Sequence, residues 1–192
     1  MPLSELKDEE IAKLVQGGNR QAFGVLVERF GPKLLRYARK FLFDYSDAED
    51  QVQEAFIKAY MNIQSFDSTR AFSPWIYRIA HNQFINAIKK RGREPVAFID
   101  LDVVMPFLRS EADPRNDADR TEMRQLLDRG LSKLNAKYRE TLVLYYYEDL
   151  DYQQIAEVLH VPISTVGVRL LRAKKALATV VANLDPTYGN PS

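Results

Sequence analysis

Apolar residues recur along most of the chain at the i, i+4 and i+7 or i+8 spacing of a helix with one buried face. No segment alternates convincingly enough to be a strand. In the first half, the pattern predicts a helix capped by Asn19 and a second helix that resumes after Pro32. A third helix is expected to start at a capping box on Ser46, and a fourth at Ser73 as N-cap. Residues 1–93 are therefore expected to form a small helical bundle.

The same periodicity fills the end of the chain. It predicts one helix, then a helix capped by Asn135, a short helix opened by a capping box on Asp151, and a last helix capped by Ser164. We expect residues 120–182 to form a second helical domain and residues 183–192 to be a disordered tail. The predicted fold class is all-α, with two small helical domains.

The segment that joins the two domains, residues 94–119, is acidic and contains three prolines. The net charge is +3 for residues 1–94, −4 for residues 95–119 and +2 for residues 120–192. We expect a flexible linker here. Its apolar run at 103–108 favours docking of part of the linker on another surface.

The composition excludes several classes of function. Of the 192 residues 46% are apolar and 28% are charged, which is typical of a globular protein. The chain has no cysteine and only two histidines, His81 and His160, so thiol chemistry, a metal site and a catalytic triad are disfavoured. No apolar run reaches the ~18 residues of a membrane span, and the charged N-terminus is no signal peptide. We expect a cytoplasmic protein without membrane insertion, enzymatic activity or cofactor.

Residues 152–175 have the form of a helix-turn-helix. A short helix with the small residue Ala156 is followed by a turn of about four residues and a helix with a basic outer face. Because arginine pairs with guanine edges and with phosphates, this unit is predicted to bind duplex DNA. The alternative is a plain helical hairpin. The side chains predicted to lie outside its core are Thr165, Val168, Arg169, Arg172 and Lys175.

A second basic stretch runs from Ser68 to Arg93, with six basic residues and no acid. Aromatic residues, including Phe72 and Trp75, lie among the basic ones. This mixture suits single-stranded DNA, because rings stack on bases while cations follow phosphates. Asn82 is a candidate for reading a base edge. The alternative is that the rings belong to the core of the bundle, and for Trp75 the core is favoured.

The third predicted helix has an acidic face. Asp47, Asp50 and Glu54 are spaced i, i+3 and i+7 on the side away from its apolar stripe. A solvated face is the default interpretation, and a basic protein partner is the sharper one. A metal-dependent hydrolase is disfavoured, because the sequence supplies neither a nearby histidine nor a second carboxylate helix.

Three motifs together resemble a family. The runs DAEDQVQEAFIKAY (47–60), FSPWIYRIAHN (72–82) and YYYEDLDYQQIAEVLHVPISTVGVRLLRAKKAL (145–177) are similar to bacterial RNA polymerase sigma factors of the extracytoplasmic-function type. The resemblance covers about residues 10–180. It implies that residues 1–93 are sigma domain two, that residues 120–182 are sigma domain four, and that the chain recognises promoters and helps to melt DNA.

The resemblance implies partners as well as roles. Core RNA polymerase and promoter DNA, duplex and single-stranded, are expected partners, and the family type implies an anti-sigma factor. The acidic linker resembles the segment that threads toward the polymerase active-site and RNA-exit region. The residues that match the stretch docking on the clamp helices of the largest polymerase subunit are Asp47, Asp50, Gln53, Glu54 and Phe56.

The resemblance also assigns the basic stretch to the minus-ten element. Asn82 matches a position of the pocket that takes a flipped-out base, near Phe66, Phe72 and Trp75. The basic end of the helix, expected to face promoter DNA, consists of Lys89, Lys90, Arg91 and Arg93.

The last helix matches the family's recognition helix for the minus-thirty-five element. This chain has Gly167-Val168 where many members carry an arginine and a serine, which removes a contact worth ~1–3 kcal/mol. Asn86 stands where an acid is common, and His160 occupies the turn. The matching residues are Ser164, Thr165, Arg169, Leu171, Arg172 and Lys174.

A different class of function stays open at this point. A free-standing helix-turn-helix regulator with an N-terminal sensing bundle has the same C-terminal pattern. Such a protein binds duplex DNA tightly on its own, usually as a symmetric dimer. The acidic face and the aromatic residues of the basic stretch argue against it.

Overall fold

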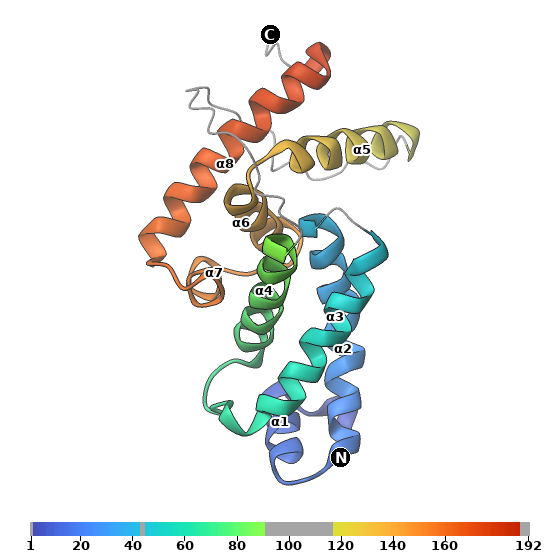
Figure 1. The fold of residues 1–192 in the computed structure, drawn as a ribbon, viewed down its shortest axis with the longest axis vertical. Helices are drawn as coiled ribbons and strands as arrows, with labels where there is room; N and C mark the ends of the chain where they lie inside the picture. The colour runs from blue at the N-terminus through green and yellow to red at the C-terminus, as the bar shows by residue number, and fades with distance from the viewer. Residues whose placement is uncertain (1, 43–44, 91–116, 189–192) are drawn as a thin grey trace.

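The computed structural model describes residues 2–42, 45–90 and 117–188, and within these ranges the chain is helical with no strand (Figure 1). The predicted all-α class is therefore confirmed. Most of the predicted linker, residues 94–116, lies outside the described residues. The first unit contains η1 (Leu3–Glu5), α1 (Asp8–Gln16), α2 (Arg20–Leu42), α3 (Tyr45–Asn62), η2 (Ile63–Ser65) and α4 (Phe72–Lys90). The second contains α5 (Asp117–Lys133), α6 (Ala136–Tyr146), α7 (Tyr152–Leu159), α8 (Ile163–Leu184) and η3 (Pro186–Tyr188).

Helix α2 is the central element of the first unit, and it packs against α1, α3 and α4. The prediction of two helices separated at Pro32 is wrong, because α2 continues through Pro32. A proline inside a helix removes one backbone hydrogen bond and costs ~3 kcal/mol. The apolar stripe is uninterrupted on both sides of it, and burial of that stripe offsets this cost. The stripe consists of Ala22, Leu26, Phe30, Leu34, Tyr37, Ala38 and Phe41.

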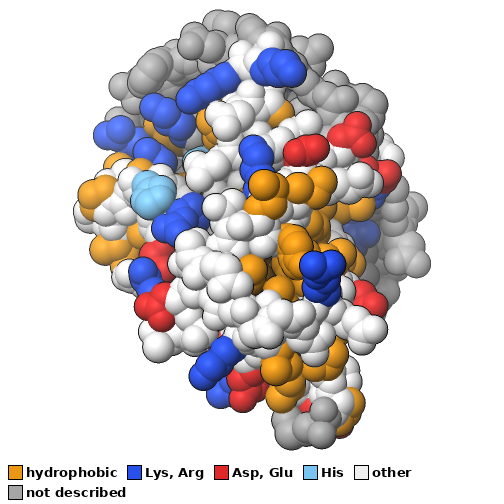
Figure 2. Space-filling view, turned by 60° about the horizontal axis from the view of Figure 1, so that its bottom comes forward, with side chains coloured by type: hydrophobic (Ala, Val, Ile, Leu, Met, Phe, Trp, Pro, Cys, Tyr) orange, Lys and Arg blue, Asp and Glu red, His pale blue; other side chains and the backbone are white. Residues whose placement is uncertain are grey.

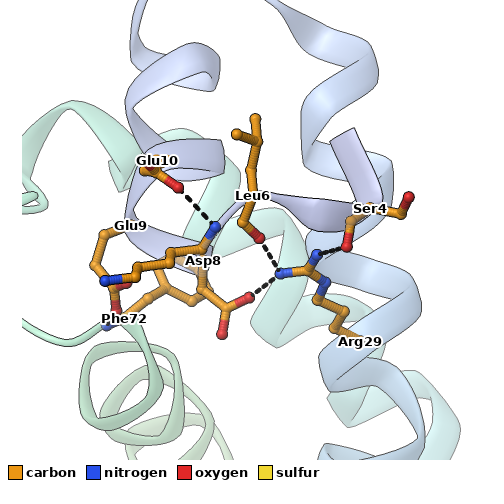
Figure 3. A network of polar contacts seen from close by, with 8 residues as sticks. Ser4, Leu6, Asp8, Glu9, Glu10, Arg29 and Phe72 are labelled. Atoms are coloured by element: carbon orange, nitrogen blue, oxygen red, sulfur yellow. Dashed lines mark hydrogen bonds and ion pairs between the residues drawn. The ribbon is translucent and has the colours of Figure 1, made fainter. Parts of the chain in front are cut away.

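Arg29 ties the N-terminal segment to α2 (Figure 3). Its Nη1 donates to Asp8 Oδ1 at 2.6 Å and to the carbonyl of Leu6 at 2.9 Å. Its Nη2 donates to the carbonyl of Ser4 at 2.7 Å. One guanidinium therefore holds η1 and the start of α1 against the middle of α2.

Helix α4 begins at Phe72, so the prediction of Ser73 as its N-cap is wrong. The Phe72 N–H donates to Glu9 Oε1 of α1 at 2.8 Å. A carboxylate suits the positive end of a helix dipole and replaces a local cap there. The cap comes from 63 residues upstream, where no local sequence signal points to it.

Two of the predicted caps in the second unit are confirmed. Asn135 Oδ1 accepts from Tyr138 N at 2.9 Å, and Asp151 with Gln154 forms the expected capping box. The prediction for Ser164 is wrong, because α8 begins at Ile163 with Pro162 as N-cap. The Pro162 carbonyl accepts from the amides of Thr165 and Val166, so the serine lies within the first turn.

The end of the chain is more structured than expected. Helix α8 continues to Leu184, and η3 follows it, so residues 183–188 do not form the predicted tail. Asp185 Oδ1 accepts from the amide and the hydroxyl of Thr187, at 3.0 and 2.6 Å, and this closes the turn between them. Residues 189–192 lie outside the described residues.

The two units pack against each other (Figure 1). Helix α7 lies against α4, and α6 and α5 lie against α2. Lys40 of α2 pairs with Asp128 of α5, and Arg36 of α2 pairs with Glu148 after α6. The described residues that are predicted to contact nucleic acid therefore lie on two units that touch each other.

Candidate nucleic-acid interface

A cavity of about 100 Å³ lies at the start of α4. The loop between η2 and α4 forms one side of it, the first turns of α4 form the floor, and α7 contributes a single side chain. Only Phe66 and Trp75 of its lining belong to the predicted single-strand residues. The lining consists of Ser65, Phe66, Asp67, Arg70, Ala71, Pro74, Trp75, Arg78 and Glu157.

Three aromatic rings form the support of this cavity. Phe66 and Phe72 are buried, and their ring centroids are 5.2 Å apart in an edge-to-face contact. Trp75 is only half-buried, and its ring lies 5.2 Å from Phe66 and 5.4 Å from Phe72. The two phenylalanines therefore hold the tryptophan in place, and Trp75 is the ring of the three that keeps a partly exposed surface.

The two cations of this cavity, Arg70 and Arg78, are not among the predicted site residues. Arg70 is exposed and Arg78 is half-buried, and both line the cavity beside Trp75. Asp67 shapes the loop that carries Arg70, because its Oδ1 accepts from the amide and the hydroxyl of Thr69. These two bonds lower the pKa of Asp67. The D-x-T spacing of this Asx-turn is the local signal in the sequence that could have indicated a shaped loop here.

The rest of α4 has an exposed polar side. Asn82, Lys89 and Lys90 are exposed, the two lysines at the last turn of the helix. Arg91 and Arg93 lie outside the described residues. On the face shown in Figure 2, blue Lys and Arg side chains lie next to orange hydrophobic ones. Red Asp and Glu side chains lie among them on the same face, so this surface is mixed in charge.

The acidic face of α3 is exposed. Asp50, Gln53 and Glu54 all reach solvent, whereas the side chain of Asp47, on the first turn, lies outside the described residues. In the described part of the chain, no group of three His, Asp or Glu side chains is arranged to hold a metal ion.

Phe56 does not belong to that exposed face. It is buried and makes an edge-to-face contact with Phe23 of α2, with ring centroids 6.3 Å apart. Besides Tyr60 (39%), the large apolar side chains that α3 exposes are Ile57 (52%) and Met61 (75%). They follow Asp50 and Glu54 by seven positions each and so extend the acidic face. That spacing was the signal in the sequence that could have identified them.

Helices α7 and α8 form the predicted helix-turn-helix. His160 ends α7 in the left-handed conformation with φ of 52°, and the Val161 amide donates to the carbonyl of Ala156 at 3.1 Å. Histidine is one of the side chains enriched in that conformation, which accounts for its place in the turn. A side chain at Gly167 would meet Tyr152 at an ordinary contact distance of 3.6 Å, so packing does not require this glycine.

The outer face of α8 combines apolar and basic side chains. Ser164, Val168, Leu171 and Arg172 are exposed, and Leu171 retains 57% of its surface. Thr165, Arg169 and Lys175 flank this face and are half-buried. Lys174 points elsewhere, because its Nζ lies 5.8 Å from the ring centroid of Tyr146 on α6. The buried side of α8 consists of Val166, Leu170, Ala173, Leu177, Ala178 and Val181.

Two family models match the chain in the order of its two units. The model described as Sigma-70 region 2 matches residues 26–94, and that described as Sigma-70, region 4 matches residues 124–177. The chain is 34% identical over 188 residues to the ECF RNA polymerase sigma factor SigW of Bacillus subtilis (strain 168). That match covers 94% of this chain and all of the relative.

Two solved structures share the fold. One is CnrH in complex with the cytosolic domain of CnrY, with a TM-score of 0.69 and 27% identity, covering 93% of this chain and 98% of CnrH. The other is the sigma factor RpoE in complex with the anti-sigma factor NepR from Bartonella quintana, with a TM-score of 0.63 and 25% identity. The second match covers 85% of this chain and 98% of its counterpart. No helix in the described ranges has both the length and the apolar character needed to cross a bilayer.

Proposed function

The chain belongs to the extracytoplasmic-function sigma factors of RNA polymerase, and we propose that it binds core polymerase, brings it to promoters and helps to open promoter DNA. Its family membership makes it a promoter-recognition factor of transcription initiation. The observation that carries the proposal is that the chain contains region 2 and region 4 in that order. The match to SigW covers 94% of this chain and all of SigW. The chain performs no covalent chemistry in this role, and it works in the cytoplasm with the polymerase.

Helix α3 is the proposed docking face for core polymerase. Its exposed carboxylates Asp50 and Glu54 suit a basic partner surface, and the exposed Gln53 lies beside them. Asp47, one turn earlier in the sequence, is the third carboxylate of the proposed docking face. Ile57 and Met61 add apolar surface at the end of the same face, which a partner helix can bury. Phe56 supports this face from within the core.

The cavity at the start of α4 is the proposed site for a base of the melted minus-ten strand. Trp75 offers a stacking surface, and Arg70 and Arg78 are placed to hold phosphates. Asn82 lies further along α4 as a base-edge reader. The basic end of α4 follows the same strand, with Lys89 and Lys90 and, beyond them, Arg91 and Arg93.

Helix α8 is the proposed reader of the duplex minus-thirty-five element. Arg172 and Ser164 are the polar side chains on its exposed face, and Thr165, Arg169 and Lys175 flank it. Leu171 and Val168 supply apolar contact of the kind that meets a thymine methyl group. Lys174 lies against Tyr146, so it positions α8 on α6 more than it reads bases.

We further propose an anti-sigma factor as a partner. The two solved structures described above are complexes, one with the anti-sigma factor NepR and one with the cytosolic domain of CnrY. The alternative of a free-standing regulator is not favoured, because the matches to known proteins are to sigma factors across both units.

A pair of substitutions tests the division of labour between the units. Asp50→Lys is expected to lower the affinity for core polymerase, measured by co-elution, by about tenfold, because the charge reversal opposes a basic partner. Glu28→Lys, the same reversal at an exposed position of α2, is the control.

Arg172→Ala is expected to reduce binding to the upstream promoter element by ~1–3 kcal/mol while co-elution with polymerase is retained. Loss of polymerase binding in Arg172→Ala together with normal binding in Asp50→Lys would refute the proposed division.

A further inference from the structure

The segment between η2 and α4, residues 65–71, supplies more of the cavity lining than α4 or α7 does. We call it the cavity loop. Apart from the buried Phe66, its side chains are largely exposed, Asp67 and Arg70 among them. Little burial therefore fixes this loop, and the position of its side chains depends on how its two ends are held.

Gln16, the last residue of α1, holds the first end of the cavity loop. Its Nε2 donates to the carbonyl of Ile63 at 2.8 Å and to the carbonyl of Phe66 at 2.7 Å. Gln64 Nε2 donates in return to the Gln16 carbonyl at 3.0 Å. Carbonyls at the end of a helix lack partners within the helix, and this amide supplies a donor for two of them. Gln16 therefore fixes the backbone that carries the Phe66 ring.

Glu9, on the same helix, holds the second end. Its Oε1 accepts from the Phe72 amide at 2.8 Å, where the cavity loop passes into α4 (Figure 3). Glu9 and Gln16 are both half-buried. They lie seven positions apart, which places them on one face of α1. A single helix therefore grips the loop at its entry and at its exit.

Helix α1 is itself firmly anchored. Ile11, Ala12 and Val15 are buried against the first unit, and the guanidinium of Arg29 holds Asp8. The match to Sigma-70 region 2 begins at residue 26, so α1 precedes the matched stretch. The lining of the cavity in the described part of the chain includes no residue of α1. Its influence on the cavity therefore passes through the loop.

We propose that Glu9 and Gln16 are positioning residues of the single-strand site. By fixing both ends of the cavity loop, they hold Phe66 against Trp75 and keep Arg70 at the cavity before a strand arrives. A loop ordered in advance favours binding, because its conformational freedom is not lost when the strand binds. The inference rests on the proposed function, because it takes the cavity as the site for a melted base.

The test uses uncharged substitutions in the full-length chain. Gln16→Met removes the amide donors and keeps the length and the helix propensity of the side chain. Gln21→Met, the same change at an exposed position of α2, is its matched control. Glu9→Met and Glu9→Gln lose the same charge, but only the glutamine keeps an oxygen that can accept from the Phe72 amide. Comparing these two therefore isolates the hydrogen bond from the charge.

The first measurement follows the loop in the free chain through Trp75, the single tryptophan. Its ring lies 5.2 Å from that of Phe66, so displacement of the loop changes its surroundings. Gln16→Met and Glu9→Met are expected to shift its emission to longer wavelength and to increase quenching by acrylamide. Gln21→Met and Glu9→Gln should match wild type. Circular dichroism verifies that every variant is helical, and if Gln16→Met does not fold, the Glu9 pair decides alone.

The second measurement uses holoenzyme reconstituted with core polymerase. Transcription from genomic fragments of the source bacterium with wild type first identifies a promoter. A fork of that promoter, duplex upstream and single-stranded at the minus-ten element, is then the labelled probe for anisotropy. Gln16→Met and Glu9→Met are each expected to bind the fork at least about fivefold more weakly, the scale of one net hydrogen bond.

Two comparisons separate positioning from a general structural loss. Glu9→Gln and Gln21→Met should bind the fork within about twofold of wild type. A probe with the duplex upstream element alone should be bound equally by all the holoenzymes, because α8 is unchanged in every variant.

The inference is overturned if either folded Met variant at Glu9 or Gln16 binds the fork within about twofold of wild type. It is also overturned if Glu9→Gln binds as weakly as Glu9→Met, since the hydrogen bond then has no part in the effect. If wild-type holoenzyme initiates on none of the genomic fragments, the proposed function fails and the inference falls with it. If wild type initiates and the variants bind alike, only the positioning role of α1 fails.

Discussion

Phe72 and Trp75 lie one helical turn apart at the start of α4, in different surroundings. Phe72 has no exposed surface and packs on Phe30 and Phe66, whereas Trp75 is half-buried at the cavity. Phe72→Ala is expected to lower the free energy of unfolding by ~3–5 kcal/mol. Trp75→Ala should cost less stability and should instead weaken single-strand binding. Urea unfolding and strand anisotropy on both variants check this, and equal losses of stability would contradict it.

Tyr147 gives the protein a pH dependence in the alkaline range. Burial, aided by the nearby Asp128 carboxylate, raises the pKa of Tyr147 to about 12. In the unfolded chain the phenol ionises near pH ~10. The folded state therefore retains a proton that the unfolded state releases, and stability is lost as the pH rises from that value through the raised pKa.

Tyr147→Phe isolates this contribution from the other titrating groups. Between about pH 8 and about pH 10.5, wild type is expected to lose ~0.8 kcal/mol more unfolding free energy than the phenylalanine variant. Guanidinium unfolding at both pH values measures the difference. Parallel pH profiles would mean that the phenol ionises equally in the folded and unfolded chains.

Residue-level features were predictable where their cause is local. Asn135 and Asp151 cap helices through amides three residues away, so the sequence around them carries the whole signal. Ser73 and Ser164 also look like caps, but a distant glutamate and a proline carbonyl satisfy those helix ends instead. The aromatic residues of the basic stretch show the same limit, because periodicity does not distinguish a buried Phe72 from a half-exposed Trp75.

At the scale of elements, α5 and α8 approach each other closely at Gly130. A Cβ built on Gly130 would lie 2.9 Å from Leu177 Cδ1 and 3.1 Å from Val181 Cγ2. Gly130→Val is therefore expected to lower stability by ~1–3 kcal/mol through overpacking. Gly24→Val in α2, where a Cβ meets nothing within 4 Å, is the control and should be close to neutral or mildly stabilising. Thermal unfolding of both variants decides whether the crossing is as tight as described.

The elements themselves follow from the hydrophobic pattern, with informative exceptions. The stripe of α2 continues through Pro32, so a local breaker was outweighed by burial on both sides of it. The acidic face of α3 was evident from spacing alone. Its apolar continuation, Ile57 and Met61, was recognised only when the structure showed which side of the helix is covered.

At the scale of the whole molecule, the contact between the units was invisible in the sequence. Arg36 and Glu148 are 112 residues apart and each resembles an ordinary surface charge. Nothing local indicates that one will be buried against the other. The same holds for Glu157, which belongs to the helix-turn-helix by its position and to the cavity of the other unit by its contact.

Covalent joining of the units should silence the protein. The chain has no cysteine, so Lys40→Cys with Asp128→Cys introduces a unique pair at an ion pair between α2 and α5. Bridging this pair with a bismaleimide that contains a reducible bond is expected to abolish transcription with core polymerase, and reduction should restore it. Each single-cysteine variant treated in the same way is the control. Full activity of the bridged protein would mean that the units need not separate.

Arg36 pairs with Glu148, and Arg70 pairs with Glu157, within one chain. The strength of this contact therefore does not depend on the concentration of the protein. The ratio of molecules with packed units to molecules with separated units is set within each molecule, so it does not change with expression level. Any activity that requires the units to separate is therefore reduced by a constant factor at every abundance. A separate inhibitor behaves differently, because it is used up when the sigma factor exceeds it. A contact within the chain scales such an activity, whereas a separate inhibitor sets a threshold for it.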